Sequence, residues 1–224
     1  MRKFFARYKF FGIVLSIISV LIISLIYNAL KPVARLPIYQ PATLNPKLVD
    51  STLHYTKKYH TIADFSLTNQ NGETINQNTY EGKIYIADFF FTTCPSICPL
   101  MTKNMNVIQE ATKADKDVML LSHSVTPEID SVAQLKKYAL ENGIIDSKWN
   151  LVTGDKKQIY ELARKSYFAV LNDGDGGPYD MIHTENFILI DKEKRIRGTY
   201  DGTNKEEIEK LLEDLKILRT SYIN

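Results

Sequence analysis

The stretch that decides the fold is KIYIADFFFTTCPSICPLM, residues 83–101. Its first part, residues 83–93, is a dense run of apolar and β-branched residues, which is typical of a strand buried inside a sheet. After Pro99 the apolar residues recur at helical spacing, so the second part predicts a helix. The two cysteines of the chain, Cys94 and Cys98, lie between these elements. We therefore expect both thiols where a buried strand gives way to a helix.

On both sides of this unit, strands and helices alternate. Asn71-Gly72 indicates a hairpin turn upstream, and Asp155 is placed to cap a helix downstream. The other expected elements are a strand over 117–125, a helix from Pro127 to Asn142-Gly143, a short element from Trp149, a helix over 156–170, a strand over 183–191, its hairpin partner over 195–202 and a helix over 205–219. This order predicts an α/β fold, a three-layer sandwich with helices on both faces of a sheet.

The N-terminus predicts a membrane anchor. Residues 10–30, FFGIVLSIISVLIISLIYNAL, carry no charge, and a helix of roughly 20 apolar residues spans a bilayer core. Four basic residues and no acid precede this run. By the positive-inside tendency, residues 1–9 form a cytoplasmic tail and the rest is exported, which implies the periplasmic side of a bacterial inner (cell) membrane. A cleaved signal peptide is the alternative, but its apolar core is usually about 7–15 residues.

Residues 31–58 are predicted to form a proline-rich tether. Their prolines recur every four or five residues, which favours extended chain over helix. The folded domain is then expected over 59–221, a length that supports one hydrophobic core. His54 and His60 lie in or near this tether, so we expect both to be solvated.

Composition and charge narrow the function classes. The chain of 224 residues has a net charge of +2. Without the four N-terminal bases, the basic residues fall from 28 to 24, against 26 acidic residues. A nearly neutral body argues against nucleic acid as a partner, since nucleic-acid binders carry a basic face. Two cysteines are also too few for a scaffold built on disulfides.

The cysteine pair allows three kinds of chemistry. A structural disulfide across so short a loop stabilises little, because the stabilisation grows with loop length. A soft-metal site is favoured by two thiolates with an imidazole, which suit copper, whereas structural zinc sites close with four protein ligands. Thiol–disulfide exchange is the third possibility, although redox pairs are commonly spaced one residue closer. The residues alone leave metal binding and disulfide exchange both open.

TTCPSICPLM, followed by YDMIHTENFILID, resembles the Sco/SenC family of copper proteins. VTPEID-SVAQLKKYA and the W-x-L-x-T-G segment from Trp149 to Gly154 appear in the family's order, and the likeness covers roughly 60–218. One departure is Thr126, which stands where the family often has the first aspartate of an acidic stretch; Asp130 matches the second. That departure puts any role of the first aspartate in doubt.

The resemblance implies a thioredoxin-like domain that binds one copper ion, Cu(I) or Cu(II), through Cys94, Cys98 and His183. It also implies a metallochaperone for cytochrome c oxidase assembly, delivering copper to the CuA centre of subunit II or to another exported cuproprotein. The alternatives are a thiol–disulfide oxidoreductase, with Cys94 and Cys98 as its redox-active pair, and a copper or redox sensor. Catalytic turnover therefore stays open, and a metallochaperone need not be an enzyme.

We also derive expectations for other residues near the motif. His123 ends the second strand and is expected on the same side of the sheet as the cysteines, in a supporting or packed role. Asp88 is expected to lie near the thiols and to influence their proton transfers. Met101 and Met105 are expected to pack in the core. Residues 171–180, rich in glycine and aspartate, predict a loop, since the aspartates do not have EF-hand spacing.

Overall fold

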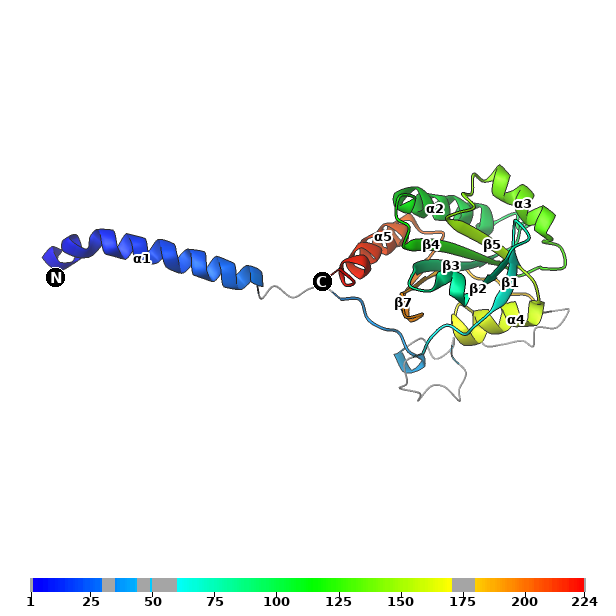
Figure 1. The fold of residues 1–224 in the computed structure, drawn as a ribbon, viewed down its shortest axis with the longest axis horizontal. Helices are drawn as coiled ribbons and strands as arrows, with labels where there is room; N and C mark the ends of the chain where they lie inside the picture. Colours follow the sequence, from blue (N-terminus) through cyan, green and yellow to red (C-terminus); the bar gives the residue numbers. More distant parts are fainter. Residues whose placement is uncertain (1, 30–34, 44–48, 50–59, 171–179, 224) are drawn as a thin grey trace. The chain divides into compact units, whose positions relative to one another are not determined.

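The structure is a computed structural model and describes residues 2–29, 35–43, 49, 60–170 and 180–223. The chain divides into two compact units, Met1–Arg35 and Leu36–Asn224. The first unit contains α1, Arg2–Ala29. Within it, Tyr8–Tyr27 is long and apolar enough to cross a membrane by length and composition, with a mean hydropathy of 2.7. The second unit contains every strand that the structure describes (Figure 1).

A seven-stranded sheet forms the middle layer of the second unit, in the order β2-β1-β5-β4-β3-β6-β7. Its strands are β1 Ser66–Asn69, β2 Thr74–Asn76, β3 Ile84–Phe90, β4 Val118–Ser124, β5 Trp149–Thr153, β6 Asn186–Ile190 and β7 Ile196–Asp201. β3 runs parallel to β4 and antiparallel to β6. All residues of β3 are buried, as the apolar run over 83–93 predicts.

Helices cover both faces of the sheet, so the predicted three-layer α/β sandwich is confirmed (Figure 1). One face packs against α2 Ile97–Thr112, α3 Val132–Glu141 and α5 Lys205–Thr220. The other face packs against α4 Lys156–Glu161 and the π-helical turn η4 Leu162–Ser166. The described residues also include two short 3-10 turns, η1 Pro41–Thr43 and η3 Gln77–Tyr80.

Some helix boundaries differ from the prediction. α2 begins before Pro99, because proline is tolerated in the first turn, where its missing N–H has no helical partner. α3 begins at Val132 and not at Pro127, since Ser131 is the residue whose side chain caps the helix. The helix predicted over 156–170 does start after its cap, Asp155, but it widens into η4 and ends at Ser166. Two residues later, Phe168 has a φ of +50°.

Part of the predicted tether packs against the domain. The guanidinium of Arg197 in β7 donates to the carbonyl oxygens of Leu36 (2.6 Å) and Pro37 (2.9 Å). The backbone N–H of Tyr39 donates to the carbonyl oxygen of Ile196 at 2.9 Å. Leu36, Pro37 and Tyr39 therefore belong to the second compact unit. His54 and residues 171–179 lie outside the described residues.

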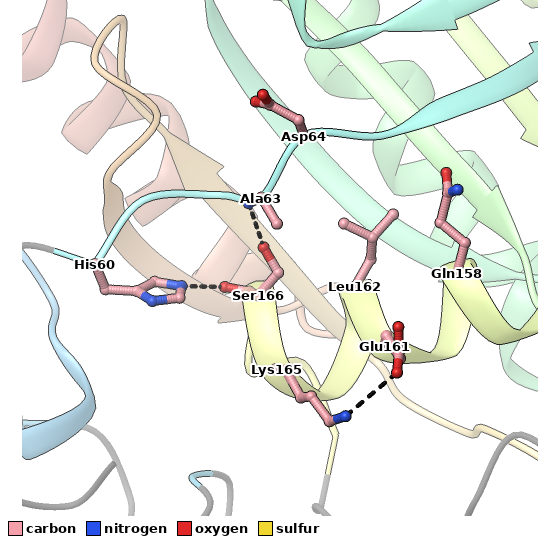
Figure 2. Close-up of a pocket in the computed structure, with 8 residues that line it drawn as sticks. All are labelled: His60, Ala63, Asp64, Gln158, Glu161, Leu162, Lys165 and Ser166. Atoms are coloured by element: carbon pink, nitrogen blue, oxygen red, sulfur yellow. Dashed lines mark hydrogen bonds and ion pairs between the residues drawn. The ribbon is translucent and has the colours of Figure 1, made fainter.

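The prediction that His60 is solvated is wrong. Its Nε2 lies 2.6 Å from the carbonyl oxygen of Ser166, and its ring centroid lies 4.5 Å from that of Phe168. Figure 2 shows His60 beside η4, on the rim of a cavity of about 250 Å³ that Lys165 also lines. His60 is held at the domain by a carbonyl of η4 and by the aromatic ring of Phe168, which follows η4.

Candidate metal and thiol site

Cys94 and Cys98 lie between the end of β3 and the first turn of α2, as predicted. Both are free thiols and buried, with exposed fractions of 6% and 3%. The backbone N–H of Cys94 donates to the carbonyl oxygen of Phe91 at 3.3 Å. The hydroxyl of Ser96, the cap position of α2, lies 3.7 Å from the Cys94 sulfur. A tight turn followed by a helix start therefore brings both sulfurs to one place.

The two thiols have different acidities. Burial raises the pKa of Cys94, but hydrogen bonds from the backbone N–H groups of Cys98 and Ser96 outweigh it and lower the pKa to about 7. These are N–H groups that a helix start leaves unpaired. For Cys98, burial dominates and raises the pKa to about 12, and the neighbouring Cys94 adds to the effect. Near neutral pH, Cys94 therefore exchanges between thiol and thiolate, while Cys98 keeps its proton.

Asp88 lies beneath the thiols on the same face of the sheet. Its carboxyl group accepts a hydrogen bond from the Ser122 hydroxyl, which in turn accepts one from Trp149 Nε1 at 2.8 Å. Burial raises the pKa of Asp88 to about 7. Its charge also helps to raise the pKa of Cys98, in agreement with the predicted place of Asp88 near the thiols.

Asp130 anchors the turn that leads to the cysteines. It is fully buried, and its carboxylate accepts hydrogen bonds from the backbone N–H of Thr92 (3.2 Å) and from three hydroxyls. The hydroxyls belong to Thr92 (2.6 Å), Ser124 (2.6 Å) and Thr126 (3.1 Å). Asp130 thus ties the segment after β3 to the end of β4. Thr126, at the position that departs from the family pattern, donates to Asp130.

His183 lies on the segment before β6, three residues earlier than the strand itself. Its side chain is exposed. Its ring meets the ring of Phe91 edge to face, with centroids 5.4 Å apart. Phe91 also contributes a backbone hydrogen bond that acts on the pKa of Cys98. The structure therefore brings His183 to the turn that carries the cysteines, with Phe91 as the shared neighbour.

The three predicted ligands are not assembled into a coordination sphere. Among the described residues, no three His, Cys, Asp or Glu side chains converge closely enough to hold a metal ion. The donor types nevertheless fit a soft metal: two sulfurs, one of them a thiolate near neutral pH, and an exposed imidazole beside their turn. Coordination by all three requires the His183 side chain to move toward the sulfurs.

His123 is not on the side of the cysteines, so that expectation is wrong. It belongs to the opposite face of β4, where its ring stacks on Phe89 with centroids 4.8 Å apart and meets Tyr167 at 5.3 Å. Burial lowers its pKa to about 4. Met101 and Met105 are fully buried on the cysteine side and pack in the core, as predicted.

The sequence analysis did not identify the contacts of Asp180, three residues before His183. The guanidinium of Arg164 in η4 forms a two-pronged ion pair with Asp180, with both N–O distances 2.6 Å. The Tyr160 hydroxyl lies 3.1 Å from the carbonyl oxygen of Asp180. Asp180 was considered only as one aspartate of a loop. No local pattern links it to an arginine on a helix of the other layer.

Comparison with known proteins places this chain among related sequences. A family model described as SCO1/SenC matches residues 54–219. The SCO1 protein homolog of Bacillus subtilis is 32% identical over 161 residues, which is 71% of this chain and 83% of that protein. This chain covers most of the length of that relative.

Solved structures show the same similarity. BsSco, a member of the Sco family of cytochrome c oxidase assembly proteins in which a disulfide switch was identified, is 31% identical with a TM-score of 0.61. The match covers 71% of this chain and 94% of BsSco. ScoI of Bradyrhizobium japonicum, solved with copper bound, is 27% identical with a TM-score of 0.56, over 70% of this chain and 99% of that one. The thioredoxin-like fold class is thereby confirmed.

Proposed function

The chain belongs to the SCO1/SenC family, and from this premise we propose that it is a copper-binding protein of cytochrome c oxidase assembly. One copper ion would be its cargo. The proposed ligands are the sulfurs of Cys94 and Cys98 and the imidazole of His183. The copper-bound ScoI of Bradyrhizobium japonicum supports copper as the metal.

The observation that carries this proposal is the pair of buried sulfurs at the start of α2. Thiolates are the form in which cysteine binds metals, and the pKa of Cys94 near 7 supplies one without a strong base. A soft metal lowers the effective pKa of a second thiol by binding it, so Cys98 would lose its proton on coordination. The imidazole of His183, exposed beside Phe91, would complete a three-ligand set.

Release of the copper would proceed by exchange of ligands. A partner's thiols would replace Cys94 and Cys98 one at a time as they approach the turn. Because His183 is exposed, it is the ligand that a partner reaches first. The CuA centre of cytochrome c oxidase subunit II is the recipient that the family resemblance suggests.

We place the protein at the bacterial cell membrane, with α1 as its anchor. Tyr8–Tyr27 has the length and composition of a membrane span, and four basic residues precede residue 10. The positive-inside tendency would then put residues after α1 on the exported side. That side is where a chaperone for an exported copper protein has to act.

A second candidate function is thiol–disulfide exchange. The observation that favours it is the split between the pKa values of about 7 and about 12, because an attacking thiolate beside a protonated partner is the arrangement of a redox pair. In this reading, Cys94 attacks a partner disulfide and Cys98 resolves the mixed disulfide. The disulfide switch of BsSco is compatible with this role.

Copper binding by the full chain in detergent micelles tests the first function. The reduced protein is titrated with Cu(I) and then with Cu(II), and absorption and EPR spectra are recorded. We expect one equivalent, thiolate-to-Cu(II) charge transfer, and an affinity that falls by orders of magnitude in His183→Ala. His60→Ala is the matched control: His60 packs against η4, on the face of the sheet opposite the cysteines, and the variant should bind copper like the wild type.

A disulfide assay separates the two functions. The wild type, Cys94→Ser and His183→Ala are each given an oxidised dithiol peptide, and the reduction of its disulfide is followed. Under thiol exchange, Cys94→Ser abolishes the reduction and His183→Ala leaves it unchanged. Copper binding that is weak and indifferent to His183→Ala would reject the copper function and leave thiol exchange as the better account.

A further inference from the structure

A buried ion pair holds the segment that carries His183. Arg164 Nη1 lies 2.6 Å from Asp180 Oδ2, and Arg164 Nη2 lies 2.6 Å from Asp180 Oδ1. The two side chains are only 7% and 9% exposed. A guanidinium that grips both oxygens of a carboxylate fixes direction as well as distance. Asp180 is therefore held in one orientation, three residues before His183.

Further anchors lie on both sides of His183. Before it, the Tyr160 hydroxyl is within hydrogen-bonding distance of the carbonyl oxygens of Asp180 (3.1 Å) and Val125 (3.0 Å). After it, the Thr184 hydroxyl and the Asn186 side-chain amide both donate to the carbonyl oxygen of Ala169 at 2.8 Å. The segment 180–186 is thus attached to the chain around η4 at both ends.

Side chains along this segment alternate between inside and outside. Ile182 and Thr184 are buried, with exposed fractions of 3% and 6%. Met181 is 45% exposed, and His183 is exposed as well. Alternation of this kind is the period of an extended chain, in which neighbouring side chains point in opposite directions. Fixing the even-numbered residues therefore turns His183 outward, where its ring meets Phe91.

Stability alone is a poor reason for such an ion pair. Burying two charges costs about as much as their attraction returns, and an apolar pair of the same volume is often at least as stable. What the pair does supply is a fixed geometry, because only guanidinium matches both carboxylate oxygens. The proposed metal ligand nearest to this ion pair in sequence is His183, three residues after Asp180.

We propose that Arg164 is a positioning residue for His183: through its grip on Asp180 it holds the imidazole beside the cysteine turn. The expected effect on copper affinity rests on the proposed copper function, whereas the positioning of His183 can be measured in the metal-free protein. Residues around a metal site that orient a ligand typically contribute about 10- to 100-fold to metal affinity. Loss of the grip should therefore weaken copper binding without touching either sulfur.

The test compares Arg164→Lys with Arg197→Lys in the full chain in detergent. Arg197 is a matched control, since it is also a buried arginine paired with an aspartate, Asp191, at 2.9 Å, but it lies in β7 and holds Pro37 and Leu36. Both substitutions keep the charge and remove the guanidinium. Arg164→Lys loses the two-pronged grip on Asp180, whereas Arg197→Lys loses single bonds to Asp191, Pro37 and Leu36. Hydrogen–deuterium exchange of the metal-free proteins and Cu(II) EPR of the loaded ones are recorded.

In Arg164→Lys we expect faster exchange confined to residues 180–186, weaker nitrogen hyperfine coupling in the EPR spectrum and an affinity lower by about 10- to 100-fold. The pKa of Cys94, read from its alkylation rate, should not change. Arg197→Lys should keep the wild-type affinity and spectrum even where it melts at a lower temperature. The inference is overturned if Arg164→Lys matches Arg197→Lys in exchange over 180–186 and in the nitrogen coupling.

Failure of the copper function gives a different pattern. In that case the wild type and His183→Ala bind copper equally poorly, while the exchange experiment still reports whether Arg164 holds the segment. Should Arg164→Lys not fold, Asp180→Asn takes its place under the same criteria, because it keeps the shape of the carboxyl group and removes its charge.

Discussion

The two segments that carry the proposed ligands are each anchored by one buried carboxylate, but the anchors differ in kind. Asp130 holds residues 91–98 through the backbone N–H and the hydroxyl of Thr92, and it joins them to the hydroxyls of Ser124 and Thr126, so that all its donors are neutral. Asp180 holds residues 180–186 through the guanidinium of Arg164. The first anchor joins two neighbouring strands of the sheet, whereas the second reaches across to a helix of the other layer.

The difference explains what each segment contributes. The cysteine segment connects β3 directly to α2, so its thiol chemistry is set by backbone N–H groups a few residues away. Residues 180–185 of the histidine segment precede β6 and belong to no helix or strand, and the ring of His183 meets Phe91, which is far away in sequence. The low pKa of Cys94 is therefore a local property, whereas the place of the imidazole is a tertiary one.

Removing the Asp130 carboxylate should have the largest effect. In Asp130→Ala the four donors around it lose their acceptor inside the protein, and breaking such a buried network costs about 3 kcal/mol of unfolding free energy. Urea denaturation measures this loss. Asp155→Ala, which removes an exposed helix cap, should cost only about 1 kcal/mol and is the control. Equal losses in the two variants would contradict the anchoring role of Asp130.

The stability of the protein should depend on pH through Asp88. The pKa of this carboxyl is raised from 3.8 to about 7, so the folded protein keeps a proton that the unfolded chain releases. The contribution of Asp88 to stability is therefore complete below pH 3.8 and is lost as the pH rises toward 7. Asp88→Asn should not show this loss, which amounts to a few kcal/mol.

The measurement is the difference in unfolding free energy between the wild type and Asp88→Asn from pH 4 to pH 8. Taking the difference is necessary because His123, whose pKa is lowered to about 4 by burial, changes stability in the opposite direction over the same range. A difference that does not change with pH would mean that Asp88 is not protonated in the folded protein.

The two thiols should react at different pH values. Alkylation of Cys94 by iodoacetamide should be half-maximal near pH 7, because backbone hydrogen bonds stabilise its thiolate against the effect of burial. Cys98 should stay unreactive until far higher pH, since its pKa is about 12. Mass spectrometry of each single Cys→Ser variant follows one thiol at a time. If both thiols show the same pH profile of alkylation in the folded protein, backbone hydrogen bonds do not explain the low pKa of Cys94.

The smallest effect is expected at the contact between the two segments. Phe91→Leu removes the aromatic edge that meets His183 but keeps an apolar side chain. We expect faster amide exchange at residues 181–185 and a copper affinity lower by a few fold, with the pKa of Cys94 unchanged. Phe90→Leu is the control, because that ring faces Tyr138 and not His183. If Phe90→Leu lowers copper affinity more than Phe91→Leu does, the contact between Phe91 and His183 does not support copper binding.

Local signals predicted much of the fold. The apolar run over 83–93 identified β3, and the turn at Asn71-Gly72 joins β1 to β2 with Gly72 at a φ of +78°. Asp155 caps α4 as expected. Such signals work because a buried strand, a tight turn and a helix cap each depend on a few neighbouring residues. The start of α3 was missed because Ser131 was not recognised as its cap.

The other errors have a tertiary cause. His60 was expected in solvent, and it is instead held by the Ser166 carbonyl, 106 residues away in sequence. His123 was expected beside the cysteines, and the alternation of β4 puts it with Phe89 on the opposite face. Each error concerns which distant residue a side chain meets.

The sequence by itself determined that two thiols stand between a buried strand and a helix, because apolar periodicity and the spacing of Cys94 and Cys98 are properties of one short stretch. Only the tertiary structure decided where His183 lies, since its position depends on Phe91, Arg164 and Ala169, which come from three other parts of the chain. Covalent neighbours constrain a residue over a few bonds. Contacts between residues far apart in the sequence depend on packing and on buried hydrogen bonds, and they produce no periodic pattern in the sequence.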